Sequence, residues 1–207
     1  MHKVMVFIDY ENFEIARQKI YKTNNPNDAR YQAPWLDLVK FPRELVRKVS
    51  PEFNLTKTFL FVPEPDDFLK TAPWRKKKYD FLKGLGTRDF FTVISGRHVA
   101  RPVAGYTHET MDIDDKKTYF IDEKGTDVNM AVQMLTKAYH NAYDTAIIVS
   151  ADTDYIPVCD ILNTIGKTVV VVGVKGQQLP KFRSCSDKQV FLGLDFLQKC
   201  ERPSREE

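Results

Sequence analysis

Short apolar runs alternate with helical patterns along the chain. The runs are mostly continuous and rich in β-branched residues, as expected for strands that are covered on both faces of a parallel sheet. They span residues 4–8, 59–62, 90–94, 146–149 and 169–172. A further stretch at residues 118–121 is expected to pair with residues 99–103 as a hairpin. Because helical patterns lie between the runs, their order predicts a three-layer α/β domain around a mostly parallel central sheet.

The clearest helical pattern lies between residues 128 and 142. Apolar side chains recur there at intervals of three and four, which is typical of an amphipathic helix: Val128, Ala131, Val132, Leu135, Ala138, Tyr139 and Ala142. A second pattern, at residues 158–165, follows Pro157 and precedes Gly166, and these residue types are favoured in the first turn and just after the end of a helix. Weaker patterns cover residues 35–49 and 74–82.

The length of the chain favours one domain with surface insertions. With 207 residues, 43% of them hydrophobic, the chain can bury one sizeable core and needs no second domain. Residues 21–34 and 104–124 fit the alternating pattern poorly, so we expect surface insertions there within a single domain at residues 1–200. The charged residues 201–207 are expected to form a flexible tail.

Charge and cysteine content say little about partners. The formal net charge is +3, which gives no general attraction to nucleic acids or membranes. The three cysteines are widely spaced and form no C-x-x-C pair, so they indicate neither a disulfide framework nor a zinc site. The apolar run at the N-terminus is too short for a signal peptide or a membrane span. We therefore expect a soluble, cytoplasmic protein that does not act at membranes.

Four aspartates lie where predicted strands end or a helix begins. Asp9 follows the first strand, and Asp152 and Asp154 follow the strand at residues 146–149. Asp127 lies at the start of the clearest helix. The carboxyl ends of parallel strands share one edge of a sheet, and ligands bind in the crevice beyond that edge. A helix N-cap is the simpler interpretation of Asp127 or Asp154 alone, but the coincidence of four acids favours a site.

Grouped carboxylates need a compensating charge. Two carboxylates about 5 Å apart repel by about 3 kcal/mol at an effective dielectric of about 20, and neither strand end has an adjacent Lys or Arg. Oxygen ligands without a nearby Cys or His suit Mg²⁺ or Mn²⁺, which leave room for waters and a phosphate. The pattern therefore predicts a divalent-metal site formed by Asp9, Asp127, Asp152 and Asp154.

Three sequence blocks contain these acids: "FIDYENF" at residues 7–13, "KGTDVNMA" at 124–131 and "VSADTDYIP" at 149–157. In sequence and order they resemble the signature blocks of NYN domains, which belong to the PIN-like nuclease superfamily and include the LabA-like (DUF88) proteins. The resemblance implies a PIN-like, Rossmann-like fold and a metal-dependent endoribonuclease that hydrolyses RNA with a metal-activated water. By motif, the implied catalytic residues are Asp9, Asn12, Asp127, Asp152 and Asp154, with Ser150, Lys124 and Asn129 in supporting roles.

Two basic segments are candidates for contacts with RNA. They supply Arg75, Lys76, Lys77, Lys78, Arg97 and Arg101. Clustered cations flanked by aromatic side chains can bind phosphates and stack unpaired bases, which favours single-stranded RNA, although a solvated helix face explains the lysine run equally well. His98 is interpreted as exposed in a loop and not as catalytic, and Trp35 and Trp74 as packing residues.

Two other functions stay open at this point. "DTD" at residues 152–154 is similar to the nucleophile loop of haloacid-dehalogenase-like phosphatases, but that family carries the motif on its first strand, where this chain has "DYEN". A non-catalytic module could also keep the fold and its acids while it recruits RNA or protein, because activity cannot be read from ligands alone. The sequence leaves three properties open: the base preference, whether RNA is cut at its ends or in its interior, and the oligomeric state, including whether the protein forms a homodimer.

Overall fold

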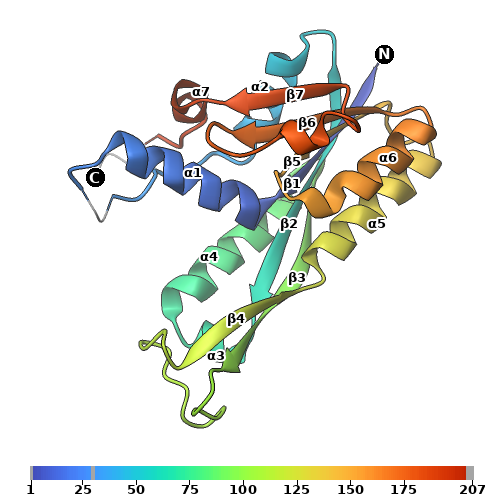
Figure 1. The fold of residues 1–207 in the computed structure, drawn as a ribbon. Helices are drawn as coiled ribbons and strands as arrows, with labels where there is room; N and C mark the ends of the chain where they lie inside the picture. Colours follow the sequence, from blue (N-terminus) through green and yellow to red (C-terminus); the bar gives the residue numbers. More distant parts are fainter. Residues whose placement is uncertain (1, 29–30, 204–207) are drawn as a thin grey trace.

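A seven-stranded sheet forms the centre of the molecule, which the computed structural model describes at residues 2–28 and 31–203 (Figure 1). Its strands are β1 (Lys3–Asp9), β2 (Asn54–Pro65), β3 (Phe91–Pro102), β4 (Tyr119–Lys124), β5 (Thr145–Val149), β6 (Thr168–Val174) and β7 (Lys188–Leu192). They are ordered β4-β3-β2-β1-β5-β6-β7, and each neighbouring pair is parallel except β3 with β4. The predicted α/β fold with a mostly parallel sheet is confirmed.

Helices cover both faces of this sheet and form the outer layers (Figure 1). One face packs against α1 (Tyr10–Asn24), α2 (Lys40–Val49), α4 (Pro73–Gly84) and α7 (Leu194–Lys199), and the other against α5 (Thr126–Tyr139) and α6 (Ile156–Thr164). Short elements connect them: α3 (Asp67–Lys70), η1 (Leu85–Thr87), η2 (Thr153–Tyr155) and η3 (Pro180–Phe182). Within the described residues, none of the helices has both the length and the apolar character needed to cross a bilayer.

The central strand β1 shows why a continuous apolar run predicts a buried strand. Val6 and Ile8 belong to the core on the α1 side of the sheet, and Met5 and Phe7 belong to the core under α5 and α6. Successive side chains of a strand point to opposite faces, so helices on both sides leave no exposed position between them. The run therefore stays apolar until the strand ends at Asp9.

Most predicted elements are confirmed, and the errors lie at their ends. The expected hairpin exists as the antiparallel pair of β3 and β4, with Ile121 opposite Ala100. The helix expected at residues 35–49 was placed too early, because α2 begins at Lys40. Trp35, expected to be a packing residue, packs edge to face against Phe81 with 5.4 Å between the ring centres, although it is 54% exposed. The apolar patterns did not reveal α1, β7 or α7.

α5 is confirmed as a helix, but the face that it buries only partly overlaps the predicted one, because Ala131, Leu135 and Ala138 contact the core as predicted. Met130, Met134 and Ala138 pack into the core, whereas Val128 is 66% exposed and Tyr139 is 67% exposed. The apolar residues of this helix cover a wider arc than its neighbours bury. An apolar series at helical spacing therefore predicted the helix correctly and its buried side only in part.

The chain changes its direction of winding at β1, which is where α/β sheets form their ligand crevice. From β1 it proceeds through β2 to β3 on one side, while β5, β6 and β7 follow one another on the other. Asp9 pairs with Phe61, and the next residues of β2, 62–65, have no partner on β1. They pair instead with β3, which continues with β4 as an arm beyond the body of the sheet (Figure 1). The end of β1 is therefore set back behind the end of β2.

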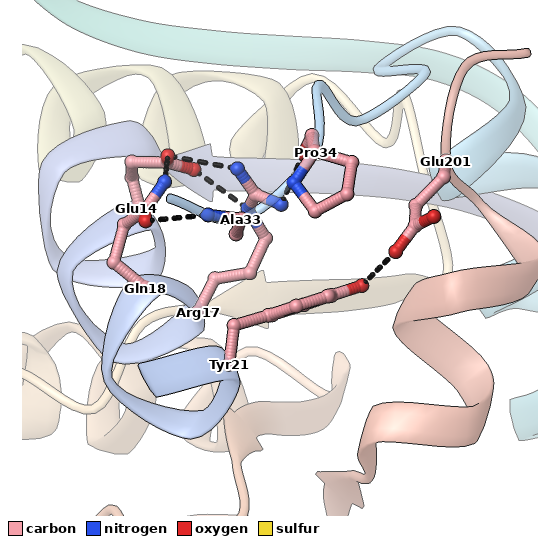
Figure 2. A network of polar contacts seen from close by, with 7 residues as sticks. All are labelled: Glu14, Arg17, Gln18, Tyr21, Ala33, Pro34 and Glu201. Atoms are coloured by element: carbon pink, nitrogen blue, oxygen red, sulfur yellow. Dashed lines mark hydrogen bonds and ion pairs between the residues drawn. The ribbon is translucent and has the colours of Figure 1, made fainter. Parts of the chain in front are cut away.

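A network of polar contacts fastens the segment that follows α1 to that helix (Figure 2). Arg17, which is 3% exposed, donates from Nε and Nη2 to both carboxylate oxygens of Glu14 and from Nη1 to the carbonyl oxygen of Pro34. Gln18 donates to Glu14 and accepts from the backbone N–H of Ala33. The buried positive charge of Arg17 is thus neutralised by a partner on the same helix.

Two segments that the sequence placed outside the core take part in this network. The expected insertion at residues 21–34 begins inside α1, where the hydroxyl of Tyr21 donates to the carboxylate of Glu201 from the expected tail (Figure 2). Residues 204–207 of that tail and residues 29–30 of the insertion lie outside the described part of the chain. The network therefore joins α1 to the described end of the chain.

Candidate functional site

Asp9 ends β1 and caps α1, and its carboxylate is buried at the point where the winding changes. The residue is 5% exposed. Its Oδ1 accepts from the backbone N–H of Asn12 at 3.2 Å, and its Oδ2 accepts from the hydroxyl of Ser150 at 3.0 Å. Both oxygens have a donor, but in the described part of the chain no lysine or arginine forms an ion pair with Asp9. The charge of this carboxylate is therefore solvated by hydrogen bonds and not neutralised.

The loop after β5 brings two further acids to Asp9. The backbone N–H of Asp152 donates to the hydroxyl oxygen of Ser150 at 3.1 Å, and the N–H of Asp154 donates to Oδ1 of Asp152 at 3.0 Å. Ser150, which is 1% exposed, is thus shared between the carboxylate of Asp9 and this loop. It fixes the way in which the loop approaches the end of β1.

Asn12 connects three chain segments that meet at this edge of the sheet. Its Oδ1 accepts from the backbone N–H of Ala151 at 3.0 Å and from Nε2 of Gln177 at 2.9 Å. Gln177 follows β6 and in turn accepts from the N–H of Val174 at 2.9 Å. The first turn of α1 is therefore held against the loops after β5 and β6. Gln177 was missed in the sequence because no motif surrounds it.

Asp127 reaches the site from the first turn of α5. Tyr155, which is 1% exposed, donates its hydroxyl to Oδ1 of Asp127 at 2.6 Å. The start of α5 can approach β3 because Gly96 has no side chain, and a Cβ there would lie 2.1 Å from Oγ1 of Thr126. Gly125 turns the chain from β4 into α5 with a φ of 79°, a conformation that glycine adopts readily. The two glycines therefore set the position of Asp127.

The acids at this edge repel one another. Burial raises the pKa of Asp9 to about 7, and repulsion from Asp127 and Glu123 adds to this effect. Loss of water around its carboxylate also raises the pKa of Asp127, which is repelled in turn by Asp152, Glu123 and Asp154. Carboxylates in such surroundings either retain a proton or bind a cation. The four predicted aspartates thus share one electrostatic environment.

Two residues that sequence reasoning did not select, Glu123 and His98, face this environment. They lie opposite each other in β4 and β3, with 3.6 Å between Oε2 of Glu123 and Nε2 of His98. The imidazole of His98 lowers the pKa of Glu123. The interpretation of His98 as an exposed loop residue is wrong, because it lies in a strand and its side chain is 14% exposed. The expected hairpin, residues 99–103 with 118–121, ended just before this pair, and its extension would have placed His98 and Glu123 on the same face.

A cavity of about 350 Å³ lies beside these residues, along the part of β2 that extends past β1. This volume falls in the range of small-molecule sites, about 300–1,000 Å³. The polar and aromatic part of its lining consists of Tyr10, Glu11, Trp74, Arg75, Lys78, Tyr79, His98 and Glu123. Because Glu123 also repels Asp9 and Asp127, the cavity adjoins the acids.

The basic run on α4 is divided between this cavity and solvent. Arg75 and Lys78 line the cavity, and residues three positions apart are neighbours on a helix surface. Lys76 and Lys77 are exposed and do not belong to the lining. Of the four predicted cations on α4, two therefore face the cavity.

The other predicted basic and supporting residues, Arg97, Arg101, Lys124 and Asn129, have partners other than the acids of the site. Asp122 of the β3–β4 arm pairs with Arg101 at 2.9 Å and with Lys124 at 2.9 Å, so both cations are engaged locally. Arg97 lies opposite Lys124 in the same arm and is exposed. Asn129 donates to a backbone carbonyl of β3 at 3.2 Å and joins α5 to the sheet. None of these four residues lies among the hydrogen bonds that the described residues form around Asp9.

The donor chemistry of the edge fits a hard divalent cation, although it forms no complete metal cage. The acids that share the edge offer carboxylate oxygens alone: Asp9, Glu123, Asp127, Asp152 and Asp154. Across residues 2–28 and 31–203, no three His, Cys, Asp or Glu side chains are grouped closely enough to hold a metal ion. Mg²⁺ is usually held by one or two carboxylates, with waters and substrate phosphates as its other ligands. The edge fits a cation that binds together with its substrate.

The fold and this acidic edge define an α/β protein of the PIN-like class, with a mostly parallel sheet and a buried carboxylate at its switch point. A sequence model of the NYN domain matches residues 3–193, so the chain belongs to the NYN domain family, which is part of the PIN-like nuclease superfamily. The resemblance of the three sequence blocks is thereby confirmed. Proteins with NYN domains are generally nucleases.

A solved structure shares this fold. It is a crystal structure of a protein of unknown function from Vibrio parahaemolyticus RIMD 2210633, with a TM-score of 0.59 and 18% sequence identity over 95% of this chain and 96% of that chain. At this identity the likeness supports the fold alone. Comparison with curated proteins gives no match.

Proposed function

We propose that this protein is a metal-dependent endoribonuclease that hydrolyses phosphodiester bonds of single-stranded RNA, with Mg²⁺ or Mn²⁺ as its cofactor. Nucleases of the NYN family act on RNA, which supplies the substrate class. The observation that carries the proposal is the buried carboxylate of Asp9, which is repelled by Asp127 and Glu123 and forms no ion pair within the described residues. A buried carboxylate with like-charged neighbours at a ligand crevice is a mark of a functional site.

The residues around Asp9 prepare the site before a substrate arrives. The hydroxyl of Ser150 and the N–H of Asn12 orient its carboxylate, and the side chain of Asn12 holds the neighbouring loops in place. The hydroxyl of Tyr155 orients Asp127 in the same way. Groups that are already oriented need no rearrangement when charge develops on the reacting phosphate.

The metal would be held, directly or through water, by Asp9, Asp127, Asp152 and Asp154. When bound, it activates a water and stabilises charge on the attacking and leaving oxygens of the phosphate. Asp127 is exposed to solvent, and its raised pKa brings it closer to neutral pH. Because Asp9 is 5% exposed whereas Asp127 is open to solvent, Asp127 is the acid better placed to orient the attacking water and accept its proton.

Cleavage of a circular single-stranded RNA tests the proposal. An endonuclease opens such a circle, whereas an exonuclease finds no end on which to start. We expect a linear product with Mn²⁺ or Mg²⁺, and none with EDTA or with the Asp9→Asn variant. Asp80→Asn, the same change at an exposed acid on α4, is the matched control and should keep the activity. Opening of the circle in EDTA, or by Asp9→Asn at the control rate, would contradict the proposal.

Two alternative functions, a non-catalytic module and a phosphatase, predict different results. RNA binding without cleavage in any divalent metal would favour a non-catalytic module that has kept the fold. A haloacid-dehalogenase-like phosphatase would form an acyl-phosphate on Asp152, and membership of the NYN family gives no support to that mechanism.

A further inference from the structure

The cavity beside the acids combines aromatic side chains with positive charge. Trp74 forms part of its wall and is 59% exposed, which contradicts the interpretation of this residue as a packing residue. The guanidinium of Arg75 lies 4.6 Å from the centre of the Trp74 ring, and Nζ of Lys78 lies 4.9 Å from the centre of the Tyr10 ring. Two aromatic rings of the wall therefore each have a cation next to them.

The same cavity reaches the acidic edge. Tyr10 and Glu11, which line it, directly follow Asp9 in the chain. Glu123, on another wall, repels Asp9 and pairs with His98. A ligand that fills the cavity would consequently lie next to any group that is held at the acids.

We propose that the cavity binds one unpaired nucleotide of the RNA, adjacent to the phosphate that is cleaved. This inference rests on the proposed function and identifies the part of the substrate that the protein recognises. The base stacks against the exposed ring of Trp74, whereas Tyr10, which is 5% exposed, forms a buried part of the wall beside Lys78. Arg75 and Lys78 contact the phosphate that is joined to this nucleotide.

The physical properties of the cavity favour a nucleotide over a peptide or an apolar molecule. Every base has a flat face that can stack on an aromatic ring, whatever its sequence. Arg75 and Lys78 match the phosphates that accompany each base, whereas an apolar side chain would gain nothing from them. A base that is paired in a duplex is not free to enter a cavity. The cavity would therefore select single-stranded RNA.

A fluorescence titration measures this binding separately from cleavage. The chain has two tryptophans, so the Trp35→Phe variant leaves Trp74 as its single tryptophan, and EDTA removes divalent metals. The probes are a single-stranded hexamer of adenosine nucleotides and a hexamer of abasic sugar phosphates with the same number of phosphates. We expect the adenosine probe to quench Trp74 and to bind about tenfold to a hundredfold more tightly, because stacking acts in that probe alone.

Variants of the cavity wall separate stacking from charge. In binding experiments with labelled probes, Trp74→Ala should remove most of the difference in affinity between the two probes. Trp74→Phe should keep part of this difference. The exposure of Trp74 means that neither change disturbs the core. Lys78→Ala should weaken the binding of both probes. It should also reduce the slope of the logarithm of the binding constant against the logarithm of the salt concentration by about 0.7. Lys77→Ala, beside it in the chain but outside the cavity, should have a smaller effect.

The outcomes distinguish this inference from the proposed function. Equal affinity for the two probes, or no response of Trp74 to either, would overturn the inference, and opening of circular RNA would then still support the nuclease. Base-dependent binding without cleavage in any metal would contradict the nuclease and support a nucleotide-binding cavity. Stronger quenching by an acidic peptide than by the adenosine hexamer would assign the cavity to a protein partner and overturn the inference.

Discussion

Two buried clusters at α1 contain charged groups, and they differ in how the charges are balanced. In the cluster of Figure 2, Arg17 and Glu14 neutralise each other through two hydrogen bonds of 2.8 and 2.9 Å. At the start of the same helix, Asp9 is buried to a similar degree, but its charged neighbours Asp127 and Glu123 have the same sign as Asp9. The first cluster is balanced, and the second is not.

This difference distinguishes a cluster that maintains structure from a candidate site. In a balanced pair, the loss of one partner leaves an uncompensated buried charge, so the pair holds its segments together. A group of like charges makes the folded state less stable, and such groups are found where a protein binds an ion or performs chemistry. Burial of a charged residue therefore does not identify a site, whereas the sign of its neighbours does.

The largest expected effect is a loss of RNA cleavage when a residue of the unbalanced cluster is replaced. Asp9→Asn should lower the rate of RNA cleavage at least about a thousandfold, because several kcal/mol of charge stabilisation are lost with the cation. Cleavage assays at saturating Mn²⁺ measure this effect, and circular dichroism shows whether the variant is folded. The matched change in the balanced cluster, Glu14→Gln, should leave the rate of the folded protein within a few-fold of the original. Similar losses in both variants would remove the distinction between the clusters.

The balanced cluster should respond mainly in stability. Arg17→Met should lower the free energy of unfolding by about 3–5 kcal/mol, because Glu14 is left without its partner. Urea denaturation measures the loss. The double variant with Glu14→Gln should be more stable than Arg17→Met alone, since no unpaired charge is left. If the double variant loses as much as the two single changes together, the pair is not coupled.

The pH dependence of stability should come from the unbalanced cluster. The folded protein holds the Asp9 proton up to a pKa of about 7, whereas an unfolded chain releases it near 3.8. Between these values the folded state binds more protons, so its stability falls as the pH rises. Without divalent metal, we expect a loss of the order of 4 kcal/mol between pH 4 and pH 8 that is missing in Asp9→Asn. Parallel pH profiles of unfolding for the two proteins would contradict the assignment.

The smallest expected effects concern the two tyrosine hydroxyls. Tyr155→Phe removes the donor that lowers the pKa of Asp127, so that pKa should rise, and Mn²⁺ affinity should fall by about tenfold. Carboxyl NMR titration and calorimetry measure the two changes. Tyr21→Phe removes the corresponding donor to Glu201 in the balanced cluster and should cost about 1 kcal/mol of stability without any change in Mn²⁺ affinity. Equal effects on metal affinity would show that Tyr155 has no special role.

Local sequence was sufficient to find the ends of β1 and β5 and the acids there, whereas it ended β2 and β3 too early. A strand that is buried on both faces has to be apolar throughout, so the residue at which the run stops marks its end. Asp9 and Asp152 were found in this way, and the three sequence blocks identified the family. None of these inferences requires information about which other segment of the chain lies nearby.

Contacts between distant segments could not be found in the same way. Glu123 and His98 meet through the register of β3 with β4. Gln177 reaches Asn12 only because the loops after β5 and β6 end at the same edge of the sheet.

The sequence by itself determined the class of fold, the family and the positions of four acids along the chain, because apolar runs and motifs are local properties. Only the tertiary structure decided that α5 buries Met130 in place of Val128, and that Arg75 and Lys78, but not their two neighbours, line the cavity. The physical reason is that the rotation of a helix and the register of a strand are set by packing against distant segments. The direction in which each side chain points follows from that packing.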